Sequence, residues 1–349
     1  MPSHSRPTRR TTVILRVLRA AGTAAAAAAL VAWLLPRVSG APWHDVAVAL
    51  GTASVLQVLA LAVIWVAGLV VHSTAQTAAM PGLTVRRALT LNLTGSAVSN
   101  VLPLGGGLGI GMNYLMVRRW GFSARQFTQY AGLLNAWHIG AKAVLPATAV
   151  GLLVADDVLI RRGLLIGAFV TSAVLLLGVL LAAAALLTAR GARIIGRSVD
   201  AVRWWVLHRP SPTPTAERLE TVRASSRDLL RAAWRPMTLG VTGYVVLQVL
   251  LLWACLGVVG AGLPLVAVIA VYAVERAATV LPFTPGGSGV VEVAATAAVV
   301  GLGGAPAVAA AGVLLYRAFV FGAEIPVGAT WLAGWWFTQR GARRRMAVA

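Results

Sequence analysis

Six ionisable side chains fall inside long apolar stretches of this sequence. They are Lys142, Glu275, Arg276, Glu292, Arg317 and Glu324. Ionisable groups at membrane depth cost about 2.5–3.5 kcal/mol each and indicate a functional site by default. Because the guanidinium fork matches phosphate oxygens, Arg317 or Arg276 is predicted to hold a phosphate group, while the carboxylates orient the arginines or accept a cation. Mutual neutralisation of these charges, which would only hold helices together, is the alternative.

A second group of polar residues lies in the first half of the chain. His138 and Lys142 are one helical turn apart and are predicted to line the same polar site, with Asn92 and Asn100 as weaker candidates. Conventional catalysis finds no support, because the sequence has no HExxH, nucleophile-elbow or Walker motif and its five histidines are scattered. The single cysteine, Cys255, allows neither a disulfide framework nor a thiolate metal site. We therefore predict no catalytic residue, metal or cofactor, and no enzymatic activity.

Two stretches rich in proline and glycine interrupt apolar surroundings: VLPLGGGLGIG at 101–111 and VLPFTPGGSG at 280–289. Irregular backbone is tolerated at membrane depth only where protein buries it or where it lines a wet cavity. Broken helices in matching halves indicate a transport site, and the helix N-termini predicted near Leu108 and Val290 would present free amides to anions. The predicted hairpin or gate residues are Pro103, Gly106, Gly107, Gly109, Pro282, Pro285, Gly286, Gly287, Gly289 and Pro326. Kinked helices packed through small residues are the alternative.

The composition indicates a polytopic membrane protein, because 58% of the 349 residues are hydrophobic and only 11% are charged. Segments long enough to cross roughly 30 Å of hydrocarbon are predicted at Val13–Leu35, Val46–Val71, Phe127–Val154, Leu164–Leu187, Leu239–Gly260 and Val308–Phe337. The interrupted regions 88–117 and 265–302 are predicted to be re-entrant hairpins, each entering and leaving the membrane on one side.

The net charge of +20 is a topology signal rather than a sign of nucleic-acid binding. Basic residues gather at the N-terminus, at 86–87, at 118–125, across 189–236 and at the C-terminus, while the other loops hold only Arg37, Arg161 and Arg162. The positive-inside rule places the first set, and both termini, in the cytoplasm. The basic excess would also attract anionic lipid headgroups. Segment 189–236 is predicted to be a basic cytoplasmic loop with an amphipathic helix at the headgroup level around RWWVLHRP.

An internal repeat relates the two interrupted regions. With one inserted residue the offset is 180 positions, and Gly106, Gly107 and Gly109 then fall on Gly286, Gly287 and Gly289. The first hairpin has arginine flanks and cytoplasmic ends, whereas the second has uncharged ends and opens outward. We therefore predict an all-α polytopic fold of about six full transmembrane helices and two opposed re-entrant hairpins forming an inverted repeat. Residues 1–349 would form a single membrane domain, with its halves at 12–154 and 237–338.

The stretch VLPFTPGGSGVVE, followed by LLYRAFVF and EIPVG, resembles the bacterial lysylphosphatidylglycerol synthase transmembrane family. That family includes the flippase part of MprF and the YbhN-like inner-membrane proteins. The resemblance covers about residues 12–338 and implies an inner-membrane protein that binds phospholipid and can move it between leaflets. The resemblance implies that the functional residues of the family correspond to Pro282, Pro285, Gly286, Gly287, Gly289, Glu292, Arg317 and Pro326 of this chain. No transferase domain follows Ala349, so synthesis of an aminoacyl lipid is not expected.

The function predicted from these features is binding and flipping of phospholipid between the leaflets of the inner membrane. The substrate would be an anionic or aminoacylated phospholipid, and the chain would have no ATP site of its own. A non-transporting partner of a separate lipid-modifying enzyme or glycosyltransferase is one alternative, and a proton-coupled small-solute transporter is another. Phospholipid and membrane are the predicted partners, nucleic acid is not, and a separate enzyme or a homo-oligomer is left open.

Overall fold

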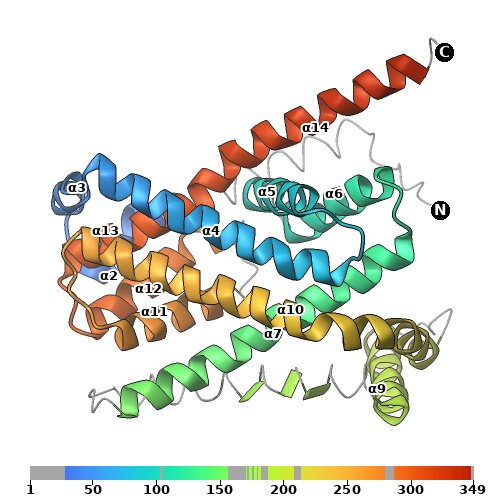
Figure 1. Cartoon of the computed structure of the whole chain (residues 1–349). Coiled ribbons are helices and arrows are strands. Elements are labelled where there is room, and N and C mark those ends of the chain that lie inside the picture. The colour runs from blue at the N-terminus through green and yellow to red at the C-terminus, as the bar shows by residue number, and fades with distance from the viewer. Residues whose placement is uncertain are drawn as a thin grey trace, which may run out of the picture. The chain divides into compact units, whose positions relative to one another are not determined.

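The fold is known from a computed structural model that describes residues 28–102, 105–155, 188–207, 214–279 and 287–346, with a few residues between 170 and 181. Every regular element in these ranges is a helix (Figure 1). The helices are η1 (Leu30–Leu34), α2 (Leu35–Ser39), α3 (Trp43–Gly51), α4 (Val55–Ala79), α5 (Val85–Val101), α6 (Gly105–Arg119), α7 (Ala124–Ala155), α9 (Ala189–Leu207), α10 (Thr215–Val258), α11 (Leu265–Ala278), α12 (Val290–Gly301), α13 (Pro306–Arg317), η3 (Ala318–Ala323) and α14 (Glu324–Met346). The predicted all-helical architecture is therefore confirmed.

The chain divides into two compact units that do not follow the order of the sequence. Unit 1 combines residues 1–65, 90–116 and 249–349, and unit 2 combines residues 66–89 and 117–248. Both glycine-rich regions, and five of the six ionisable residues predicted to lie in the membrane, belong to unit 1. Lys142 belongs to unit 2.

Three helices of the described ranges are long and apolar enough to cross a bilayer: Val55–Ala79, Arg227–Val258 and Pro306–Thr338. Val55–Ala79 has 25 residues, and at 1.5 Å per residue it extends about 38 Å. These spans match three of the six predicted crossings and establish a multi-pass membrane protein. A fourth prediction, Phe127–Val154, coincides with the continuous helix α7. The predicted crossings Val13–Leu35 and Leu164–Leu187 lie largely outside the described residues.

The predicted crossing at Val46–Val71 is wrong at its start, because two helices occupy this range. Helix α3 ends at Gly51 and α4 begins at Val55. The boundary is a capping box: the amide of Ser54 donates to Oε1 of Gln57 (2.9 Å), and the amide of Gln57 donates to the Ser54 hydroxyl (3.3 Å). Reciprocal bonds of this kind satisfy amides that have no partner in the first turn of a helix, so the Ser-x-x-Gln pattern fixes the start of α4.

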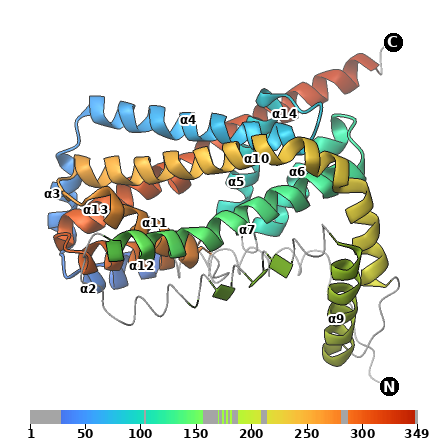
Figure 2. The same ribbon diagram turned by 60° about the horizontal axis from the view of Figure 1, so that its bottom comes forward.

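In unit 2, α4 and α10 run side by side through a seam of small residues (Figures 1 and 2). A Cβ on Gly240 would lie 2.7 Å from the amide nitrogen of Ala75, and a Cβ on Gly243 would lie 2.9 Å from the side chain of Val71. The order of these contacts shows that the two helices are antiparallel. Glycines allow backbones to approach closely, which is how helices associate without a hydrophobic driving force in lipid.

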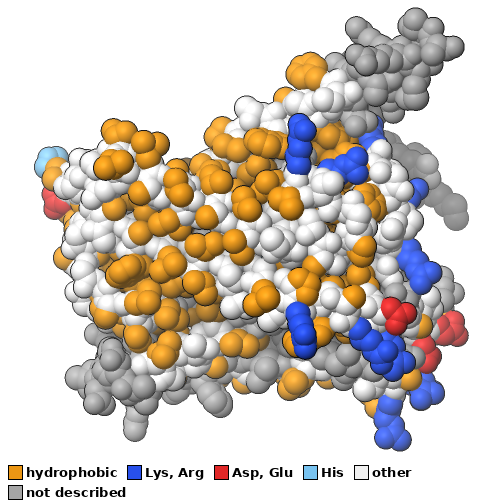
Figure 3. Space-filling model, in the orientation of Figure 1, with side chains coloured by type: hydrophobic (Ala, Val, Ile, Leu, Met, Phe, Trp, Pro, Cys, Tyr) orange, Lys and Arg blue, Asp and Glu red, His pale blue; other side chains and the backbone are white. Residues whose placement is uncertain are grey.

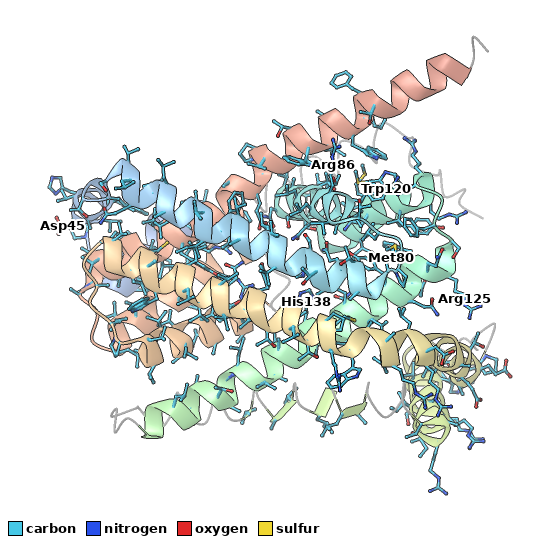
Figure 4. All side chains as sticks on the ribbon, in the orientation of Figure 1. Asp45, Met80, Arg86, Trp120, Arg125 and His138 are labelled. Atoms are coloured by element: carbon cyan, nitrogen blue, oxygen red, sulfur yellow. The ribbon has the colours of Figure 1, made fainter. Side chains whose placement is uncertain are left out.

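Charged and apolar side chains segregate on the surface of unit 2. Hydrophobic side chains cover the faces of α4 and α10 that Figure 3 presents, whereas blue side chains gather around α9 and the start of α10. Trp120 and Arg125 lie toward one end of the unit in Figure 4, and His138 lies nearer its middle. The guanidinium of Arg87 stacks on Trp120, with its Cζ 5.3 Å from the ring centroid. Arginine and tryptophan at one level are typical of a membrane–water interface.

The region predicted as the first hairpin forms two antiparallel helices, α5 and α6, which are packed through glycines. The side-chain amide of Asn113 lies against Gly95, and the Thr94 hydroxyl donates to Sδ of Met116 (3.4 Å). Nearer the turn, the Ser99 hydroxyl donates to the carbonyl of Gly105 (3.1 Å). Helix α6 begins at Gly105 and not near Leu108 as predicted, because the glycines themselves adopt helical backbone. Whether this pair of helices is re-entrant in the membrane stays a prediction.

The glycines of α6 are expected to differ sharply in their tolerance of alanine. Gly106→Ala should stabilise the protein by up to about 1 kcal/mol, because alanine has the higher helix propensity and nothing lies within 4 Å of a Cβ there. Gly109→Ala should destabilise it by about 1 kcal/mol, because its Cβ would lie 2.7 Å from the carbonyl oxygen of Gly95. Melting temperatures of the two purified variants check this, and a Gly109→Ala variant at least as stable as Gly106→Ala would contradict the packing.

Candidate functional site

Four ionisable residues meet where three helices of unit 1 begin or end. Glu275 and Arg276 occupy the last turn of α11, Glu292 the first turn of α12 and Arg317 the end of α13. Helix α12 packs against both α11 and α13, which brings these helix ends together. Glu275, Glu292 and Arg317 are all buried, and the side chain of Arg276 is 19% exposed.

The four side chains form a continuous ion-pair network. The Nε of Arg317 donates to Oε1 of Glu292 at 2.8 Å, and its Nη1 lies 3.9 Å from Oε1 of Glu275. Glu275 also pairs with the guanidinium of Arg276. Buried charges are stable only when paired and hydrogen-bonded, so removing one member would leave its partners uncompensated.

Aromatic rings cover the open faces of both guanidinium groups. The Cζ of Arg276 lies 5.1 Å from the ring centroid of Tyr272, and the Cζ of Arg317 lies 4.9 Å from that of Phe321. Tyr272 is fully buried. Stacking on a ring and pairing with carboxylates both keep a guanidinium in one plane, which is the orientation needed for bidentate recognition of a phosphate.

The start of α12 is fixed by Gly289 and Glu292. The amide of Gly289 donates to Oε2 of Glu292 at 2.6 Å, so one carboxylate both caps the helix and binds Arg317. Gly289 has φ +86° and ψ −54°, a conformation that residues with a Cβ rarely adopt. Helix α12 begins at Val290, as predicted. Gly287, the other predicted gate residue of 280–289 that the structure describes, has φ +73°.

A fifth ionisable residue, Glu324, extends the network toward the first glycine-rich pair of helices. Glu324 is buried at the start of α14, and its carboxylate lies close to the polar side chains of Ser96 and Asn100 of α5. It also lies within electrostatic reach of Arg276 and Arg317. The cluster therefore receives side chains from both the first and the second glycine-rich regions.

A wide helical turn separates Arg317 from Glu324. This turn, η3, is π-helical and covers Ala318–Ala323. Pro326 follows it, and a proline cannot donate the hydrogen bond that the carbonyl four residues earlier, that of Gly322, would accept. Single π-helical turns inside helices are frequent at functional sites because they redirect side chains.

The charge balance of the cluster limits its chemistry. Two guanidinium groups face three carboxylates, so the five side chains carry one net negative charge when all are ionised. Nε and Nη1 of Arg317 already face carboxylates, so a phosphate that binds these two donors competes with Glu292 and Glu275. Within the described residues no group of His, Cys, Asp and Glu forms a metal site.

His138 and Lys142, the two other predicted site residues, lie on α7 in unit 2. The Nε2 atoms of His138 and of the buried His72 are 3.0 Å apart. His72 stacks on Tyr244 with ring centroids 4.7 Å apart, and the hydroxyl of Tyr244 accepts a hydrogen bond from Gln248 (2.7 Å). Unit 2 thus contains a separate polar chain across α7, α4 and α10. The role of His138 and Lys142 in substrate binding stays a prediction.

Some site predictions fall outside the described residues, and some site residues were missed. Pro103, Pro282, Pro285 and Gly286 lie outside the described residues. Ser96 was missed, although a signal existed: Asn92, Ser96 and Asn100 recur every four residues and so lie on one face of the helix.

Comparison with known proteins adds one finding. The profile of the protein family described as "Lysylphosphatidylglycerol synthase TM region" matches residues 16–328 of the chain. No curated protein matches the chain. The matched range includes every described residue of the ion-pair cluster.

Proposed function

The chain belongs to the lysylphosphatidylglycerol synthase TM region family, and from this premise we propose that it binds phospholipid headgroups at the ion-pair cluster and moves the lipid between leaflets. The buried network of Glu275, Arg276, Glu292 and Arg317 carries the proposal. So many ionisable groups inside an apolar helical protein are costly, and they are typical of substrate pathways in membrane proteins.

In the proposed binding step, a headgroup phosphate takes the place of a carboxylate oxygen on Arg317. The exchange keeps the guanidinium paired, and the displaced carboxylate must take up a proton or a cation, because an unpaired buried charge is costly. Glu324, which lies close to Ser96 and Asn100, then accepts a cationic part of the headgroup. An anionic or aminoacylated phospholipid satisfies both halves of the cluster. The chain is not proposed to synthesise the lipid.

In the proposed transport step, the two glycine-rich regions act as gates on either side of the cluster. Tight backbone contact between α5 and α6 supports this for the first region. The positive φ angles at Gly287 and Gly289 support it for the second, because such turns can be rearranged without the steric cost that other residues have. Opening one gate at a time would give alternating access around a fixed headgroup site.

Phospholipid translocation in liposomes tests the proposal. The full chain is reconstituted with a fluorescent phosphatidylglycerol, and the fraction accessible to a membrane-impermeant quencher is followed over time. Arg317→Lys should slow translocation by about tenfold or more, because lysine keeps the charge but loses the planar fork, and a charge-assisted hydrogen bond contributes about 1.5–3 kcal/mol. Glu292→Gln should slow it as well, because arginine orientation is lost.

The matched control is Glu217→Gln, which neutralises an exposed carboxylate in the first turn of α10. This variant should translocate lipid at the wild-type rate. If Arg317→Lys and Glu292→Gln fold and also keep that rate, the cluster is not the headgroup site. If the wild-type chain itself accelerates no lipid movement, transport is rejected while binding can still be measured with the same labelled lipid.

A further inference from the structure

Helix α9 packs across the N-terminus of α10 in unit 2 and is hydrogen-bonded to it. Ala192, Gly196 and Asp200 share one face of α9, because they recur every four residues. Ala192 is fully buried, and Gly196 meets the backbone of Ala216 with no room for a Cβ. Asp200 accepts hydrogen bonds from the amide of Thr215 (Oδ2, 2.8 Å) and from its hydroxyl. The Asp200 side chain thus caps the N-terminus of α10, and this contact fixes the orientation of the two helices.

The remaining surface of α9 carries apolar and basic side chains. Ile195 and Val199 lie one turn apart on one face, while two other exposed apolar side chains, Ile194 and Trp204, lie on the arginine side. Arg190, Arg193 and Arg197 are spaced at three and four residues on this opposite face, and all three are exposed. Val199 is 47% exposed, so its side chain does not pack on α10.

The direction of α9 suits a position on a membrane surface. Figure 2 shows α9 running across the line of α10 at the end where the membrane-span candidate Arg227–Val258 begins. Trp234 and Arg235 lie in the first third of this candidate, with the guanidinium Cζ 5.2 Å from the indole centroid. An amphipathic helix that crosses the end of a spanning helix is expected to lie in the plane of the headgroups.

We propose that α9 is an interfacial helix that binds anionic phospholipid of the leaflet at this end of unit 2. Its Val199 face is immersed at the boundary of headgroups and acyl chains, and Arg190, Arg193 and Arg197 contact lipid phosphates. Lipid is favoured over a protein partner because three arginines with no acidic residue among them complement an anionic surface, and because α9 is tied to a spanning helix. This inference is independent of lipid transport by the ion-pair cluster.

Spin labelling of the full chain tests the proposal. In a Cys255→Ser background, which removes the only native cysteine, single cysteines replace Val199 and, as a matched control, Ala201. Both positions are exposed, but Ala201 lies on the arginine side of the helix. In vesicles of phosphatidylglycerol and phosphatidylcholine, the label at 199 should collide more with oxygen than with a water-soluble nickel complex. The label at 201 should show the reverse preference.

A second variant tests the role of charge. Arg190→Gln, Arg193→Gln and Arg197→Gln combined should reduce the immersion of the label at 199, as should pure phosphatidylcholine vesicles, because each arginine attracts the anionic surface. Equal nickel accessibility at 199 and 201 in both vesicle types would overturn the proposal and leave the face to a protein partner. If the label at 199 is immersed equally after the three arginines are replaced, or equally in vesicles without phosphatidylglycerol, the preference for anionic lipid is overturned.

Discussion

Arg317→Ala is expected to lower the free energy of unfolding by about 3–5 kcal/mol, the cost of breaking a buried ion pair by removing one partner. The side chain of Arg317 is buried between Glu275 and Glu292. Its loss would leave three carboxylates facing only Arg276 in a protein interior. Thermal or denaturant unfolding of the purified chain in detergent measures the change, and lipid translocation should be lost with it.

Two further variants separate lost charge balance from lost packing. The double variant Arg317→Ala with Glu292→Gln should recover at least about 1 kcal/mol relative to additivity, because it removes one of the unpaired carboxylates while the amide oxygen can still accept the bond from Gly289. Arg37→Ala is the surface control, because Arg37 stacks on the exposed Trp33. If Arg317→Ala lowers the free energy of unfolding no more than Arg37→Ala does, the buried network contributes little to stability.

The sequence identified most of the charged cluster, because the cost of a charge in lipid makes each such residue conspicuous on its own. Glu275, Glu292 and Arg317 required no knowledge of their neighbours. Their pairing could not be predicted in the same way, since it depends on how α12 docks between α11 and α13. Glu292 shows this limit clearly: the capping role follows from its position three residues after Gly289, but its bond to Arg317 comes from the fold.

The same reasoning explains why polar residues without charge were missed. Ser96 costs little in a membrane helix because its hydroxyl can bond within its own helix, so its presence alone predicts nothing. Its contact with Glu324 joins segments more than two hundred residues apart. The predicted helix boundary was wrong at Ser54 for a related reason. Hydropathy alone predicts one continuous apolar helix there, but the capping box of Ser54 and Gln57 starts a new helix. Sidedness in the membrane and the inverted relation of the two hairpins stay predictions.

Gly328→Val is expected to destabilise the protein by about 3 kcal/mol, at the upper end of overpacking costs. Gly328 sits where α14 touches the backbone of α5: a Cβ there would collide with the carbonyl oxygen of Leu93 and lie 2.6 Å from the Cβ of Ala97. Backbone atoms cannot move aside as a flexible side chain can, so the two helices must separate. Melting temperature and lipid translocation should both fall.

The separation would reach the candidate site through contacts on either side of Gly328. Nε1 of Trp331 donates to the hydroxyl of Thr90 at 3.1 Å, and Glu324 lies close to Ser96 and Asn100. Gly334→Val is the matched control, because the same substitution on the same helix meets nothing within 4 Å. Equal melting temperatures for the two variants would show that α14 does not depend on this contact. If only Gly328→Val loses both stability and translocation, close packing of α14 on α5 is what holds Glu324 at the ion-pair cluster.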